Sequence, residues 1–130
     1  MSSRIVLLHF GNDVLLSEAR QQVLEDAGYD VMVADTQAEV MRVLRTRRVG
    51  AVIACHSVSP GELESTVRQI RQLSPRLPVI AVHVGGLIGA PRALADGFID
   101  GLRGPEHLLS QVASFVTRDV VTRDTTAAAS

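Results

Sequence analysis

Short apolar runs alternate with amphipathic segments along this chain, and this alternation restricts the fold more than any other feature. Four strongly apolar runs and a weaker fifth lie at residues 5–10, 31–34, 51–54, 78–82 and 98–102. Strands that are apolar on both faces are typical of parallel sheets, which the crossover helices cover on both sides. The sequence therefore predicts an α/β fold with a parallel sheet and right-handed crossovers.

Helix-start and helix-stop signals fill the segments between these runs. Residues with capping side chains stand where three helices should begin, at Asn12–Asp13, Thr36 and Ser59. Thr36 and Ser59 are each followed by a glutamate at the third position, which is a capping box, and Gly28 can end the first helix. Glycine and proline interrupt residues 85–91, so we expect only 92–95 to be helical before the weak fifth strand. A last helix should begin at Pro105.

Size and composition indicate one domain. A chain of 130 residues can form a single core, and with 3% aromatic residues that core must be aliphatic. A net charge of −1 gives no electrostatic basis for binding nucleic acid or an anionic membrane. The single cysteine excludes an internal disulfide, and no apolar run is long enough to span a bilayer. We expect a cytoplasmic domain over residues 1–118 and a frayed tail over 119–130.

Two stretches resemble the receiver domain of response regulators. LEDAGYDVMVADTQAEVMRVLRTRRVGAVIACHSVSPGE is similar to the part of that family that leads into its third strand and the proline-containing loop beyond it. LPVIAVHV is similar to the family's fourth strand. The likeness extends over residues 4–116. It implies a flavodoxin-like (CheY-like) doubly wound five-stranded parallel sheet in the order 2-1-3-4-5, with helices on both faces.

The resemblance also implies a phosphorylation site, and this chain departs from it at each position. In receivers an aspartate after the third strand accepts the phosphoryl group, and here that position is Cys55. The magnesium-binding acidic pair falls on Gly11 and Asn12, with Asp13 beside them. The hydroxyl after the fourth strand falls on His83, and the lysine after the fifth strand falls on Arg103 or Gly104. Magnesium prefers hard oxygen ligands, which these residues supply poorly. We therefore expect a pseudo-receiver with no metal ion, no cofactor and no catalytic activity.

Cys55 and His83 keep a second hypothesis open. In this fold the two residues end adjacent strands, so the thiol and the imidazole should meet in the former phosphorylation cleft, near Asn12 and Asp13. A thiol beside an imidazole can become a reactive thiolate, and such residues also bind zinc. A small redox or metal sensor, or a cysteine-dependent enzyme, is thus the alternative to simple packing of Cys55. Side chains alternate along a strand, so His56 should point away from Cys55.

The remaining polar signals have structural interpretations. His9 lies in a run that should be buried, which predicts a core histidine with satisfied hydrogen bonds. His107 should be solvated on the last helix. Arginines gather between Arg42 and Arg48, where they complement a helix dipole and offer a docking surface for an acidic partner. We expect a monomer or weak homodimer that acts through contacts with a protein partner the sequence does not identify.

Overall fold

Five parallel strands form the centre of the computed structural model, in the order β2-β1-β3-β4-β5. The structure describes residues 4–84 and 95–116. The strands are β1 (Val6–Phe10), β2 (Asp30–Ala34), β3 (Ala51–Ala54), β4 (Val79–His83) and β5 (Gly97–Asp100). The strand order and the parallel direction are those that the sequence predicts.

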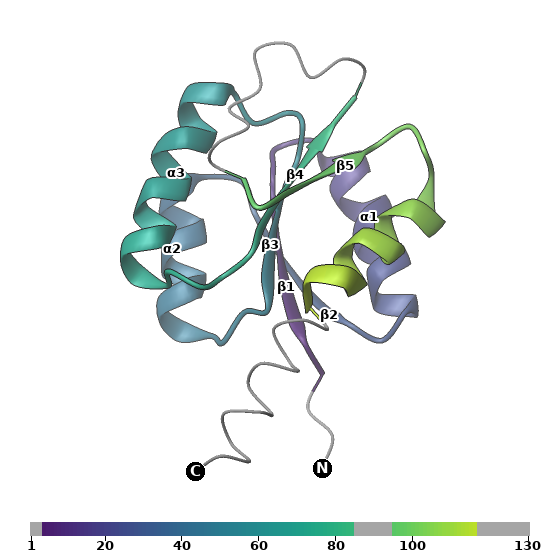
Figure 1. Cartoon of the computed structure of the whole chain (residues 1–130), viewed down its shortest axis with the longest axis horizontal. Helices are drawn as coiled ribbons and strands as arrows, with labels where there is room; N and C mark the ends of the chain where they lie inside the picture. Colours follow the sequence, from purple (N-terminus) through teal and green to yellow (C-terminus); the bar gives the residue numbers. More distant parts are fainter. Residues whose placement is uncertain (1–3, 85–94, 117–130) are drawn as a thin grey trace.

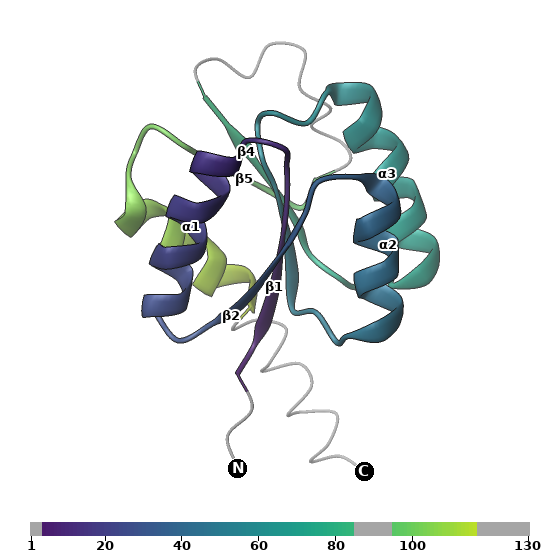
Figure 2. The same ribbon diagram turned by 180° about the vertical axis from the view of Figure 1, so that it is seen from behind.

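Helices cover both faces of this sheet. Helices α2 (Gln37–Thr46) and α3 (Pro60–Leu73) lie on one face (Figure 1). Helix α1 (Val14–Asp26) and the helical residues 105–116 lie on the other, as the reverse view confirms (Figure 2). Because every strand runs in the same direction, the carboxyl ends of all five lie along one edge of the sheet. In the described part of the chain, no helix is long and apolar enough to cross a membrane.

The predicted helix caps are confirmed. Asp13, Thr36 and Ser59 each accept a hydrogen bond from the backbone N–H three residues later, at 3.1, 3.2 and 3.2 Å. Each side chain thereby satisfies an N–H group that has no partner within the helix. Gly28 follows the C-cap of α1 with a φ of 103°, a backbone conformation that favours glycine.

Alternation along β1 divides the core into two layers. Leu8 and Phe10 pack toward α2 and α3, whereas Leu7 packs toward α1 and the final helix. The strand residues that the sequence predicts to be buried are 9% exposed or less, and they are Val6, Leu7, Val52, Ile53, Val79 and Ile80. His9 shares the face of Leu7 and has no exposed surface.

Some local expectations were wrong. The helical spacing of Leu63, Val67, Ile70 and Leu73 predicts one buried stripe on α3, but Leu73, the last residue of that helix, is 43% exposed. β5 was expected at 98–102, but it ends at Asp100 because that side chain accepts a hydrogen bond from the backbone N–H of Leu102 and forms a turn.

The described residues do not include every predicted segment. Of the expected short helix at 92–95, only Ala95 is described, and it has no regular structure. The expected tail at 119–130 lies outside the described residues.

Candidate functional site

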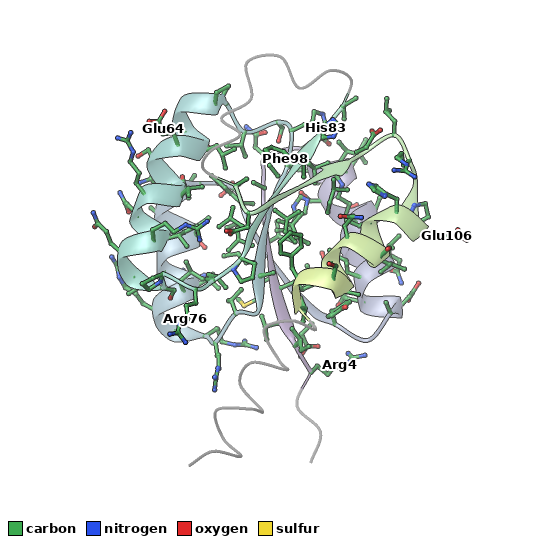
Figure 3. All side chains as sticks on the ribbon, in the orientation of Figure 1. Arg4, Glu64, Arg76, His83, Phe98 and Glu106 are labelled. Atoms are coloured by element: carbon green, nitrogen blue, oxygen red, sulfur yellow. The ribbon has the colours of Figure 1, made fainter. Side chains whose placement is uncertain are left out.

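The residues proposed for the former phosphorylation cleft gather at the carboxyl edge of the sheet. Gly11 and Asn12 follow β1 directly, and Cys55 follows β3. His83 is the last residue of β4, at the same edge (Figure 3). The expected arrangement of the strand ends is therefore present, and the contacts of each side chain decide what it can do.

Cys55 is almost completely buried, with 3% of its surface exposed. Its backbone N–H donates to the carbonyl of Phe10 at 2.7 Å, which holds the residue against the end of β1. Its Sγ accepts a hydrogen bond from Nη1 of Arg20 at 3.2 Å and lies 3.7 Å from Nδ1 of His56. The thiol is thus held between a cationic group and an imidazole.

The hydrogen-bond partners of Cys55 differ from those expected. Within the described residues, Sγ interacts with Arg20 and His56 and makes no hydrogen bond to His83. The prediction that His56 points away from Cys55 was wrong, because β3 ends at Ala54. Beyond that residue the chain turns, and the alternation of side chains along a strand no longer applies.

Arg20 is the main residue of this site that sequence reasoning missed. It lies on α1, only 8% of it is exposed, and it points at the sheet rather than into solvent. None of the ion pairs among the described residues involves Arg20. A buried guanidinium without a carboxylate partner is uncommon, because removing a charge from water is costly. Arg20 therefore brings an uncompensated positive charge to the acceptor position.

His9 links Arg20 to Ser17 in the same buried layer. Nε2 of His9 lies 3.4 Å from Nη1 of Arg20, and Nδ1 lies 3.3 Å from Oγ of Ser17. A guanidinium can only donate, so Nε2 accepts and the Nδ1–H group donates to Ser17. Burial, together with the positive charge of Arg20, lowers the pKa of His9 from 6.5 to about 4. The prediction of a core histidine with satisfied hydrogen bonds is confirmed.

The sequence contains a signal that Arg20 lies on the inner face of α1. Ser17, Arg20 and Leu24 are the buried residues of α1, and their spacing of three and four places them on one helix face. Apolar spacing predicts instead a buried face made of Leu16, Ala19, Val23, Leu24 and Ala27. Of these, Leu24 is fully buried, whereas Ala19 and Ala27 are exposed. His9 requires polar partners once it is buried, and α1 is the helix that follows its strand.

Gly11 fits closely against Cys55. A Cβ atom at Gly11 would lie 2.5 Å from Cβ of Cys55 and 3.3 Å from its Sγ. The position that the resemblance assigns to an acidic residue therefore has no room for a side chain unless the backbone moves. Next to it, the backbone N–H of Asn12 donates to Oγ of Ser57 at 3.3 Å, while Asp13 caps α1.

These residues do not fit a magnesium site. In residues 4–84 and 95–116, no three histidine, cysteine, aspartate or glutamate side chains are grouped so that they could hold a metal ion. Hard cations need several oxygen ligands, whereas Cys55, Gly11 and Asp13 offer a thiol, no side chain and a helix-capping carboxylate. The guanidinium of Arg20 at 3.2 Å from Sγ further opposes a cation there.

The loop after β5 carries the remaining predicted residues, Arg103 and Gly104. Gly101 comes directly after β5 and donates its N–H to the carbonyl of His83 at 2.8 Å. Arg103 is exposed, and Gly104 has a φ of 88° at the start of the final helix. Among the described contacts, no hydrogen bond joins Arg103 or Gly104 to Cys55.

One surface expectation also needs revision. His107 was expected to be solvated, but it is half-buried, and its Nε2 accepts a hydrogen bond from the backbone N–H of Asp100 at 3.3 Å. The final helix begins so soon after β5 that its first turn packs over the end of that strand. Arg42, one of the clustered arginines, pairs with Glu39 at 2.9 Å on the surface of α2, and docking of an acidic partner at this cluster stays a prediction.

Comparisons with known proteins identify the fold. No protein-family model and no curated protein sequence matches this chain. A response regulator receiver domain from Clostridium thermocellum is 17% identical, with a TM-score of 0.77, covering 91% of this chain and 98% of that chain. The receiver domain of a sensor histidine kinase from Pseudomonas aeruginosa, described with magnesium in its active-site cleft, is 16% identical, with a TM-score of 0.78 and coverage of 88% and 99%.

A third solved structure has the same architecture. The signal receiver domain of an HD domain-containing protein from Pseudomonas fluorescens is 17% identical, with a TM-score of 0.75, and the match covers 95% of both chains. At such identities the similarity establishes the receiver fold alone. Function must therefore be argued from the residues at the site.

Proposed function

We propose that this chain is a receiver-like signalling module that works without phosphorylation, through contacts with another protein. The observation that carries the proposal is the contact between Arg20 and Cys55 at the acceptor position, at 3.2 Å. Receivers transfer a phosphoryl group to a carboxylate there. A buried thiol beside a guanidinium is a different chemical environment, and it supports a role without phosphoryl transfer.

Electrostatics support the same conclusion. Phosphoryl transfer requires groups that position the phosphate and neutralise its developing charge, and magnesium supplies much of this in known enzymes. Gly11 and Asn12 carry no charge, and Asp13 is engaged at the start of α1. With no acidic pair to hold the metal, we assign no catalytic activity to this site.

Exposed apolar side chains support a protein contact near this edge. Val14 and Leu15, in the first turn of α1, are 66% and 78% exposed, and Val33 on the outer strand β2 is 41% exposed. Val14 and Val33 line a groove of about 430 Å³ that begins at Gly11 and Asn12. Exposed apolar surface rimmed by polar residues is typical of protein contact sites.

Intact-mass spectrometry tests the phosphorylation-independent role. The chain is incubated with acetyl phosphate and magnesium, beside a receiver that retains its acidic pair and aspartate as the positive control. We expect no mass gain for this chain and one phosphoryl group on the control. A magnesium-dependent phosphoryl adduct that disappears in Cys55→Ser would overturn the proposal.

Partner capture tests the protein contact. The partner is first captured from an extract of the source organism and identified, and its binding to the purified chain is then measured. Binding should be equal with and without acetyl phosphate, and Leu15→Glu should weaken it because a charge replaces exposed apolar surface. Gln69→Glu, which adds the same charge at an exposed position of α3 outside this groove, is the control. Binding that requires acetyl phosphate would contradict the proposed role.

A cysteine-based sensor is the second candidate, and the contact with Arg20 is the observation that favours it. A nearby cation stabilises a thiolate, which is the reactive form of cysteine. Burial of Cys55 opposes it, since a reagent must reach Sγ. We expect slow alkylation by iodoacetamide in the native state. Rapid alkylation at neutral pH that Arg20→Met abolishes, and that Arg45→Met leaves unchanged, would favour the sensor instead.

A further inference from the structure

A cavity of about 210 Å³ lies between α1, the carboxyl ends of β4 and β5, and the final helix. It does not include Cys55, Gly11 or Asn12, although Gly104, one of the two residues at the former lysine position, lies in its wall. Most of its wall is apolar and comes from Leu16, Ala19, Val23, Val82, Ile99 and Leu108. Its charged members are Arg20 and Asp100.

Arg20 presents free hydrogen-bond donors at this cavity. Its Nη1 interacts with Cys55 and His9, whereas Nε and Nη2 have no partner among the described residues. No fully buried side-chain nitrogen in the described part of the chain lacks a partner, so Nε and Nη2 must lie where solvent reaches them. The cavity that Arg20 lines is the opening that accounts for this access.

The charge of Arg20 requires compensation. Its nearest polar neighbours are a neutral imidazole, since the pKa of His9 is lowered to about 4, and the thiol of Cys55. A guanidinium that is 8% exposed and has no carboxylate partner is stabilised by an anion. A carboxylate fits best because it accepts two parallel N–H bonds from the guanidinium fork.

We propose that this cavity binds a small monocarboxylate with an apolar body, with its carboxylate on Arg20 and its body between α1 and the final helix. The inference depends only on the geometry around Arg20, and it holds whether or not Cys55 can be phosphorylated. It adds a ligand site to a module whose proposed role so far involves protein contacts alone.

Cavity size and charge narrow the ligand class. An apolar cavity of about 150 Å³ takes up benzene, and a water molecule occupies about 30 Å³ of liquid. A cavity of about 210 Å³ therefore accommodates a six-membered ring and two carboxylate oxygens. Asp100, whose Oδ1 already accepts a hydrogen bond from Leu102, adds a negative charge to the wall. Its repulsion grows with the negative charge of the ligand, which favours a monocarboxylate over a phosphate dianion.

Benzoate is the probe, and benzamide is its neutral counterpart of nearly the same shape. Each is titrated into the ¹⁵N-labelled chain while backbone amide shifts are followed by NMR. We expect saturable shifts for benzoate around Arg20, Gly101 and Leu108, and binding of benzamide weaker by at least about tenfold, since it lacks the charge-assisted hydrogen bonds. Phenyl phosphate should also bind more weakly than benzoate.

Variants separate the guanidinium from the rest of the cavity. Arg20→Met keeps the length of the side chain and should weaken benzoate at least about tenfold. Arg45→Met, at an exposed position of α2, should leave binding unchanged. Ala19 is exposed and lines the cavity, so Ala19→Trp should block benzoate without disturbing the core.

Three results would overturn the inference. They are the absence of saturable benzoate binding to the wild-type chain, equal binding of benzoate and benzamide, and benzoate binding that appears only in Cys55→Ser. The last would mean that the thiolate of Cys55 is the counter-ion of Arg20. The first two of these results are obtained with the wild-type chain, so they remain decisive even where Arg20→Met fails to fold.

Discussion

His9 should make the stability of the fold depend on pH between about 4 and 6.5. In that range the unfolded chain binds a proton on this imidazole, while the buried ring next to Arg20 remains neutral. The unfolded state thus holds more protons, and the free energy of unfolding falls as the pH is lowered through this range. The gap between 6.5 and about 4, at about 1.4 kcal/mol for each pH unit, corresponds to a full loss of about 3–4 kcal/mol, of which about 3 kcal/mol falls between pH 7 and pH 4.

Urea unfolding followed by circular dichroism measures this effect from about pH 7 down to about pH 4. The comparison is with His9→Gln, whose amide can accept from Arg20 and donate to Ser17 but does not titrate. We expect wild type to lose about 3 kcal/mol more than His9→Gln over this range. Parallel pH profiles for wild type and His9→Gln would refute the reasoning.

Two glycine changes and one aspartate change give further predictions, each measured by urea unfolding. Gly11→Ala should cost about 1–3 kcal/mol, because the new Cβ would lie 2.5 Å from Cβ of Cys55. Gly61→Ala in α3 meets nothing within 4 Å and should stabilise by about 0.5–1 kcal/mol, so destabilisation by both would contradict the steric argument. Asp96→Ala should cost about 1–3 kcal/mol, since Oδ2 accepts hydrogen bonds from Val79 at 2.7 Å and Arg71 at 2.8 Å. An unchanged midpoint would mean that solvent replaces both bonds.

Local signals made most of the fold predictable. Thr36 and Ser59 mark the starts of α2 and α3 because a capping side chain satisfies backbone groups of its own helix, which requires no knowledge of the rest of the chain. The apolar runs predict strands for a similar reason, and their alternation with helices limits the topology to few choices. The end of β5 was harder, since it depends on a side-chain turn at Asp100.

The candidate site was predictable only where backbone position determines it. The resemblance placed Cys55 at the end of β3, where the structure has it. Its partners could not be inferred, because hydrophobic periodicity predicts an inner face of α1 without Arg20, made of Leu16, Ala19, Val23, Leu24 and Ala27. The choice of Arg20 for that face depends on the polar needs of His9 and Cys55 across the sheet, which are visible only once the elements are packed.

Arg20 also determines the effect of restoring an aspartate at the acceptor position alone. Cys55→Asp places a carboxylate where Sγ now accepts from Nη1 at 3.2 Å, so the new group should pair with the guanidinium rather than bind magnesium. This ion pair lowers the pKa of the carboxyl in the folded state, so it stabilises at neutral pH and is lost on acidification. Gly11 still leaves no space for an acidic partner. We therefore expect a folded variant with no phosphoryl adduct after incubation with acetyl phosphate and magnesium. A magnesium-dependent adduct on Cys55→Asp alone would mean that neither Arg20 nor the missing acidic pair silences the site.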